Sequence, residues 1–267
     1  ESEEPLDYLT GDYLAELTML ILGRDRMKDE NLGYAKTFVR QMTDCMALAR
    51  QRGVRIVANA GGLNPAGLAA RLREIAADQG LDLAIAHVEG DDVRGMGDFG
   101  DVLTANAYLG AFGIAAALEA GADVVVTGRV TDASVVVGPA IAHHGWGRDD
   151  LDALAGAVVA GHVIECGTQA TGGNFSGFAG LDTSRPLGFP IAEIAADGST
   201  VITKDPVAGG AVTVDTVTAQ LVYEIQGPAY LNPDVSTRLD TIRLAQDGDD
   251  RVRISGVRGT PPPTTTK

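Results

Sequence analysis

The first part of the chain alternates between helical and strand-like patterns of apolar residues. Apolar positions at helical spacing predict helices over Tyr13–Leu22 and Tyr34–Arg50. Gly53 ends the second helix, and the apolar run Val54–Ala58 then predicts a short buried strand. The chain therefore begins as a layered arrangement of helices and strands.

The same pattern repeats over the next eighty or so positions. A helix is expected from Pro65 to about Gln79. Asn64 is a favourable N-cap residue for it, and proline is favourable in the first helical turn. A loop rich in glycine and acidic residues, 89–100, separates the next strand and helix. The further strands are expected at Leu83–Val88 and Asp123–Thr127, and a long helix at Val102–Ala120. This order predicts a parallel sheet with right-handed crossovers.

Beyond Asp132 the pattern predicts two apolar helices, the second near Leu151–Glu165. The loop Cys166–Gly177 is too rich in glycine for a helix or strand. Two hairpins are expected about Asp-Gly turns, which favour hairpin connections. The first hairpin spans Ile191–Lys204 and turns at Asp197-Gly198. The second pairs Thr237–Leu244 with Arg251–Val257 and turns at Asp247-Gly248. A helix is expected between the two hairpins, at Val214–Ile225.

These elements predict an α/β fold: a doubly wound parallel sheet with flanking helices, followed by a smaller α+β region with hairpins. The texture changes near Gly188, so we expect an α/β core domain over residues 1–187 and an α+β region over 188–267. No initiating Met is present, and Pro261–Lys267 directly follow a strand-like run. We therefore expect the polypeptide to be a piece of a longer chain.

Composition supports packed α/β layers. The 267 residues are 45% hydrophobic with 34 glycines, but only 5% are aromatic. No apolar stretch approaches the ~20 residues that a membrane-spanning helix needs, and no secretory signal begins the chain. Cys45 and Cys166 form no disulfide framework, which predicts reduced thiols and a cytoplasmic protein.

The net charge of −15 argues against nucleic acid and anionic membrane surfaces as partners. A small anionic substrate is still compatible with this charge, because a local arginine and helix N-termini attract anions. Long helices rich in alanine and glycine can pack closely against neighbours, so we expect a homo-oligomer.

Polar residues follow several predicted strands at their carboxyl ends, the edge where open α/β sheets bind ligands. Asn59 and Asn64 follow one strand, Glu89 another, and Arg129, Thr131 and Asp132 follow Val124–Thr127. Arg129 is suited to gripping a carboxylate or phosphate with two nitrogens. The structural alternative is that Asp132 caps the next helix and Arg129 pairs with it.

His87, Glu89 and Asp91 alternate along the chain, so an extended segment would place them on one face. Such a face is suited to a divalent metal ion. The alternative is a solvated acidic turn, and the predicted site therefore contains no metal.

Cys166 lies four residues after His162, beside a glycine-rich loop, and is a candidate catalytic thiolate. Core packing explains both residues equally well. The pair His143-His144 fits a helix C-terminus, where the helix dipole favours cations. Thr171–Asn174 lacks the lysine of a P-loop, and neither a dinucleotide fingerprint after a strand nor a Gly-x-Ser-x-Gly elbow is found.

Several longer motifs, taken together, resemble the acyclic terpene utilisation protein family. They are Gly11–Thr18, Asn59–Pro65, Thr127–Ala133, Glu165–Gly173, Gly188–Glu193 and Gly256–Pro263. The resemblance covers nearly the whole chain. It implies a role in bacterial breakdown of citronellol- and geraniol-type terpenes and branched acyl-CoA compounds. It also implies a further strand and glycine-rich loop before this segment, and more chain after Lys267.

Three hypotheses follow. The first is an enzyme of branched acyl-CoA or carboxylate catabolism, a lyase or hydratase that uses a coenzyme A thioester as substrate and no other cofactor. In it Arg129 holds a carboxylate, Asp132 or Glu89 moves a proton, and Asn59 or Asn174 polarises a carbonyl. The second is a non-catalytic subunit that organises an acyl-CoA-processing complex. The third is a metal-dependent hydrolase that uses His87, Glu89 and Asp91.

Overall fold

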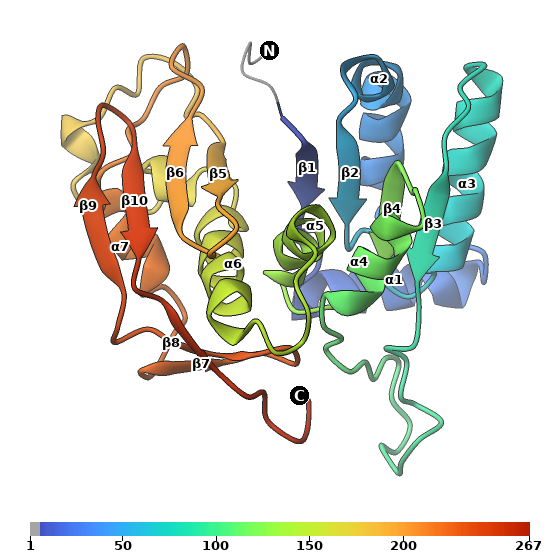
Figure 1. Ribbon diagram of the computed structural model, residues 1–267. Coiled ribbons are helices and arrows are strands. Elements are labelled where there is room, and N and C mark those ends of the chain that lie inside the picture. Colours follow the sequence, from blue (N-terminus) through green and yellow to red (C-terminus); the bar gives the residue numbers. More distant parts are fainter. Residues whose placement is uncertain (1–5) are drawn as a thin grey trace. The chain divides into compact units, whose positions relative to one another are not determined.

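The computed structural model describes residues 6–267 and has a mixed α/β fold, with a parallel sheet flanked by helices and two antiparallel sheets (Figure 1). Contacts divide these residues into two compact units. The N-terminal unit comprises residues 6–142 with 266–267, and the C-terminal unit comprises residues 143–265. The predicted parallel sheet and the antiparallel region that follows it are confirmed.

The N-terminal unit is built on a four-stranded parallel sheet in the order β1-β2-β4-β3. Its strands are β1 (Tyr8–Gly11), β2 (Arg55–Ala58), β3 (Ile85–Val88) and β4 (Val124–Thr127). All four residues of β4 are buried, as a central parallel strand requires. Because the strands are parallel, their carboxyl ends lie at one edge of the sheet, the lower edge in Figure 1.

Helices cover this sheet because its strands are apolar on both faces. They are α2 (Lys36–Arg52), α3 (Pro65–Asp78), α4 (Phe112–Glu119) and α5 (Ser134–His144), whereas α1 (Glu16–Lys28) packs in a separate small cluster with Leu14 and Leu63. On one face, apolar residues of α2 and α3 pack with Ile56, Val124 and Val126. Val57 and Val125 point to the opposite face and are fully buried as well. The central strands β2 and β4 are therefore enclosed, whereas the outer strands β1 and β3 are partly exposed.

The C-terminal unit packs its strands around one long apolar helix, α6 (Leu151–Ile164). One antiparallel sheet has the order β5-β6-β10-β9 and the other the order β11-β8-β7. The strands are β5 (Pro190–Ile194), β6 (Thr200–Lys204), β7 (Ala229–Leu231), β8 (Ser236–Arg238), β9 (Arg243–Gln246), β10 (Val252–Ser255) and β11 (Arg258–Thr260). Helix α7 (Val214–Leu221) and the short 3-10 helices η1 (Gln169–Thr171) and η2 (Phe178–Gly180) complete the unit.

The predicted long helix at Val102–Ala120 is wrong in its first half, because α4 begins only at Phe112. The preceding residues instead pair with the segment that follows β3. Asp92 and Asn106 form an antiparallel bridge, and Ala107 donates its backbone N–H to the carbonyl of Asp91. This backbone pairing uses donors and acceptors that a helix would have needed.

Three other expectations need correction. The first helix is displaced, since it begins at Glu16 rather than Tyr13. Sequence analysis missed strand β1, which has only two apolar residues, Tyr8 and Leu9. The second hairpin contains only β9 and β10, because Thr237 lies in β8 and pairs with Tyr230 of β7 and Gly259 of β11.

The boundary between the two contact-defined units falls at His143, inside α5, whereas the predicted domain boundary lies near residue 187. The difference comes from α6, which packs on β5, β8, β11 and α7 and therefore belongs with the hairpins. The expected boundary at residue 187 was placed at a change in the residue pattern. The contacts in the structure do not test whether it separates two evolutionary domains.

Candidate functional site

The carboxyl ends of β1 and β2 bring Asp12 and Asn59 together. Asn59 follows β2 and is fully buried. Its side-chain nitrogen donates to Asp12 Oδ1 at 2.6 Å, and its side-chain oxygen accepts the backbone N–H of Tyr13 at 2.7 Å. Asn59 therefore fixes the chain just after β1 and orients the Asp12 carboxyl.

The end of β4 brings Asp91 against the backbone of Gly128 and Arg129. Asp91 Oδ2 accepts the backbone N–H of Arg129 at 2.7 Å and the side-chain amide of Asn106 at 2.8 Å. A Cβ on Gly128 would collide with the Asp91 carboxyl, so this close approach needs glycine. Asp91 thereby ties the loop after β3 to the end of β4.

The Arg129 side chain is 93% buried and lies over the ring of Tyr108, with its guanidinium carbon 4.4 Å from the ring centroid. Nη2 donates to the Tyr108 hydroxyl at 2.8 Å and lies 3.3 Å from Asp132 Oδ1. The Tyr108 hydroxyl in turn donates to Glu16 at 3.2 Å. Among residues 6–267, Nη1 has no hydrogen-bond partner although it is buried.

Burial perturbs the acidic groups of this site. It raises the pKa of Asp12, although the Asn59 hydrogen bond opposes the shift. Burial also raises the pKa of Asp91, against the hydrogen bond from the Arg129 backbone. The pKa of the Tyr108 phenol is raised by burial too. Carboxyls with raised pKa values beside a buried arginine are typical of sites that transfer protons.

The predicted residues Asn59, Arg129 and Asp132 lie at this edge, and Arg129 is close enough to Asp12 to lower its pKa through charge. Thr131 shares a 2.6 Å hydrogen bond with Ser134 at the start of α5. The ion pair of Arg129 with Asp132, which the structural alternative predicted, is present as well. Both interpretations of these residues therefore have support.

Asn64 has a structural role as the N-cap of α3. Its side-chain oxygen accepts the backbone N–H of Gly67 at 2.9 Å, and its nitrogen donates to the carbonyls of Asn31 and Leu32 at 3.0 and 3.2 Å. The sequence prediction of an N-cap at this position is confirmed. Since both ends of the amide are engaged, we do not place Asn64 among the ligand-binding groups.

Two other candidates lie in the C-terminal unit. Cys166 lies after α6, is partly buried and forms no disulfide, and Asn174 is exposed. Their roles in a site shared with Arg129 stay predictions. His162, which the sequence placed near Cys166, pairs instead with Glu165 at 3.0 Å.

The structure does not gather His87, Glu89 and Asp91 into a metal site. His87 lies 3.6 Å from the exposed Glu89, whereas Asp91 is buried against Arg129 and Asn106. Across residues 6–267, no three His, Cys, Asp or Glu side chains converge as metal ligands. The hypothesis of a metal-dependent hydrolase therefore lacks the metal-binding side chains that it requires.

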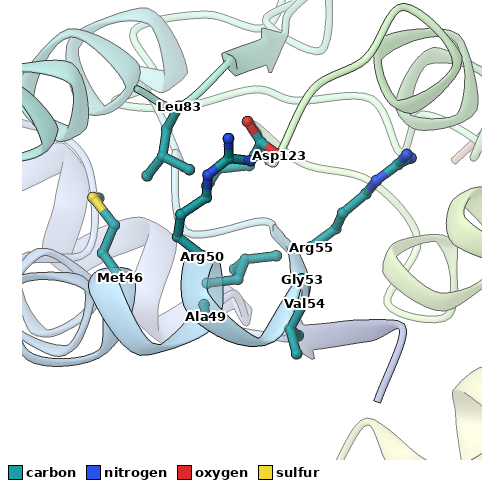
Figure 2. A pocket seen from close by; sticks show the side chains of 10 residues that line it. Met46, Ala49, Arg50, Gly53, Val54, Arg55, Leu83 and Asp123 are labelled. Carbon is teal, nitrogen blue, oxygen red and sulfur yellow. Dashed lines mark hydrogen bonds and ion pairs between the residues drawn. The ribbon is translucent and has the colours of Figure 1, made fainter. Parts of the chain in front are cut away.

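A pocket of about 150 Å³ opens at the opposite edge of the sheet, beside the amino ends of β2 and β4. Figure 2 shows Arg50 beside Asp123 in this pocket, and the two side chains pair at 3.3 Å. Asp123 also accepts the backbone N–H of Ala84 at 2.9 Å. These charged groups are mutually satisfied, so the polar chemistry of the unit lies at the other edge.

The sheet edge combines a buried cationic donor with a buried acid, a pair that can polarise a carbonyl and move a proton. Sequence reasoning missed Asp12, Glu16, Asn106 and Tyr108. Asp12 was missed because strand β1, which ends just before it, was not recognised. Asn106 and Tyr108 were hidden by the incorrect helix at Val102–Ala120.

Comparison with known proteins gives one match. The family model described as acyclic terpene utilisation family protein AtuA matches residues 1–267. No curated protein and no solved structure matches the chain. The helices described in residues 6–267 are all too short or too polar to cross a membrane.

Proposed function

The chain belongs to the acyclic terpene utilisation family, and we propose that it is an acid–base enzyme of that catabolism. Its reaction is that of a lyase or hydratase, and its substrate is a branched acyl-CoA thioester or a related carboxylate. The observation that carries the proposal is the buried Arg129, whose Nη1 has no hydrogen-bond partner in the described chain. A buried donor of this kind is costly to leave unpaired unless a ligand uses it.

The geometry favours a carbonyl oxygen over a carboxylate as the ligand of Arg129. Nη2 already donates to Tyr108 and faces Asp132, which leaves one nitrogen for the substrate. A single N–H is sufficient for the carbonyl oxygen of a thioester, where negative charge grows as an enolate forms. A carboxylate would need both nitrogens for a bidentate grip.

Asp12 is the best-placed acid or base. In the dehydration direction, its carboxylate removes the proton from the carbon next to the carbonyl. The electron pair moves onto the carbonyl oxygen held by Arg129 and then returns to form the double bond. The β-hydroxyl leaves with the proton from Asp12 as water, so the carboxylate is restored. The raised pKa of Asp12 suits a group that both takes and gives a proton near neutral pH.

The test measures conversion between 3-hydroxy-3-alkylglutaryl-CoA and its enoyl partner. We expect Arg129→Lys and Asp12→Asn each to lower kcat/KM by about 10²–10³. Arg94→Lys and Asp82→Asn are the matched controls, because Arg94 bonds only to Asp92 at the surface and Asp82 is exposed. Unchanged turnover in both site variants would contradict this assignment.

The cellular setting is part of the proposal. Neither Cys45 nor Cys166 forms a disulfide, which is what a reducing cytoplasm would maintain. We expect the active form to be a homo-oligomer. Size-exclusion chromatography with light scattering tests this expectation.

A second candidate function is a non-catalytic subunit of an acyl-CoA-processing complex. The observation that favours it is the apolar surface of α1, where Leu17, Leu20, Ile21 and Met27 are exposed. Contiguous exposed apolar residues mark protein interfaces. Affinity purification from the native host, with acyl-CoA turnover measured with and without this chain, separates the two functions.

A further inference from the structure

A second set of buried polar groups lies in the C-terminal unit, at the end of α6. His162 and Glu165 have side chains only 3% and 4% exposed, and His162 Nδ1 lies 3.0 Å from Glu165 Oε1. We assign the hydrogen of the pair to Nδ1, because an ionised Glu165 only accepts. The opposite ring nitrogen, Nε2, is buried and has no hydrogen-bond partner in residues 6–267.

Helix α7 adds a second acceptor beside His162. Gln220 is 1% exposed, and its side-chain nitrogen donates to the backbone carbonyl of His162 at 3.2 Å. This bond fixes which end of the amide is which, so the free end is the oxygen. Gln220 Oε1 is buried, and no donor within the described part of the chain reaches it.

The sheet β11-β8-β7 contributes a hydroxyl next to this pair. The Tyr230 ring lies 5.5 Å from the His162 ring, and Thr237 is the cross-strand partner of Tyr230. Cross-strand partners project to the same face of a sheet, so Thr237 is on the face that carries Tyr230. Thr237 is fully buried, and its Oγ1 also has no hydrogen-bond partner in the structure from residue 6 onward.

Buried polar atoms without partners are rare in folded proteins and call for an occupant. Here the free groups are an imidazole nitrogen and an amide oxygen, both acceptors, and a hydroxyl that can donate or accept. We propose that His162, Gln220 and Thr237 form a second binding site, which takes a small neutral molecule carrying hydroxyl groups. The ligand donates hydrogen bonds to His162 Nε2 and Gln220 Oε1, and Glu165 holds the imidazole in the accepting tautomer.

Strand β7 is the route by which a ligand enters. It is an edge strand of three residues, and Ala229 and Leu231 are exposed on either side of Tyr230. Glu224, a few residues earlier, has a φ of +61°, a strained backbone conformation for a residue other than glycine. A short edge strand held by one neighbour can open locally at low cost, and Tyr230 then uncovers His162.

The test follows the ¹⁵N resonances of the His162 ring while ethanol, 1,2-propanediol or glycerol is added to the whole protein. The matched control ligands are isomeric ethers without a hydroxyl hydrogen, dimethyl ether for ethanol and dimethoxymethane for 1,2-propanediol. We expect the alcohols to shift Nε2 and the ethers to leave it unchanged. Equal shifts with ethers, or no shift with any alcohol, would overturn the proposal.

Two nearly isosteric variants separate binding from folding. Removing a buried hydroxyl that has no partner in the described chain should leave stability unchanged or raise it. We therefore expect Thr237→Val to keep or raise Tm while weakening alcohol binding at least about fivefold. Gln220→Met should weaken alcohol binding as well, but it should lower Tm because it also loses the hydrogen bond to the His162 carbonyl. Thr203→Val, at the one half-buried position of strand β6, is the control that should change neither Tm nor alcohol binding. A lower Tm with unchanged alcohol binding would show that these groups are structural and overturn the site.

Discussion

Replacement of Asn64 with alanine tests whether this residue stabilises the fold or binds a ligand. The variant loses the N-cap bond to Gly67, worth about 1 kcal/mol. It also loses the donation to the carbonyls of Asn31 and Leu32, worth about another 1 kcal/mol because one nitrogen serves both. We expect the free energy of unfolding to fall by about 2 kcal/mol, and Tm by about 4–8 °C for a chain of this size.

The assay is urea denaturation followed by circular dichroism, with the slope of the transition checked for constancy. Asn64→Asp keeps the acceptor for the Gly67 N–H but loses the donor to the Asn31 and Leu32 carbonyls. Its free energy of unfolding should therefore fall by about half as much as that of Asn64→Ala. Asn174→Ala is the control, because this exposed amide should change stability by less than about 0.5 kcal/mol. A stability of Asn64→Ala within about 0.5 kcal/mol of the parent would refute the structural role.

Three further predictions concern the same unit. Because burial raises the pKa of Asp12, the parent's free energy of unfolding should fall as pH rises from the ordinary value of 3.8 through the raised one, and thermal melts of Asp12→Asn should lack this fall. Gly61→Ala should cost about 3 kcal/mol by denaturation, because its Cβ would lie 2.5 Å from the Thr127 carbonyl oxygen, whereas Gly95→Ala, in open space, should cost almost nothing. Leu72→Ala should cost about 2–5 kcal/mol in the same assay, since Leu72 is fully buried; a smaller loss would mean that the core collapses around the gap.

The sequence predicted the parallel sheet because its strands are apolar runs separated by helices with clear caps and glycine stops. Arg129, Asp132 and Asn59 could be placed at one edge for the same reason, since strand ends of a parallel sheet lie together. Asp12 could not, because β1 is too short and too polar to recognise alone, and it forms by pairing with β2.

Other features depend on contacts that periodicity does not encode. Residues 101–110 have enough apolar positions to suggest a helix, yet residues 105–107 pair with the segment after β3, and Leu109 pairs with Val130. The pairing of Leu109 sets Tyr108 beside Arg129. Likewise, the free nitrogens of Arg129 and His162 become visible only when all their neighbours are in place.

Because Thr266 and Lys267 return to the N-terminal unit, this unit can be completed only after residue 267 has been synthesised. Tyr108 donates its backbone N–H to the carbonyl of Lys267 at 2.9 Å, and its own carbonyl accepts from Thr266 at 2.7 Å. At about 5–20 residues per second, a ribosome needs roughly 6–25 s to make the intervening residues 143–265. During that interval the backbone of Tyr108, whose hydroxyl orients Arg129, lacks both partners. A nascent chain that already holds every strand of the parallel sheet therefore still has an unfinished site.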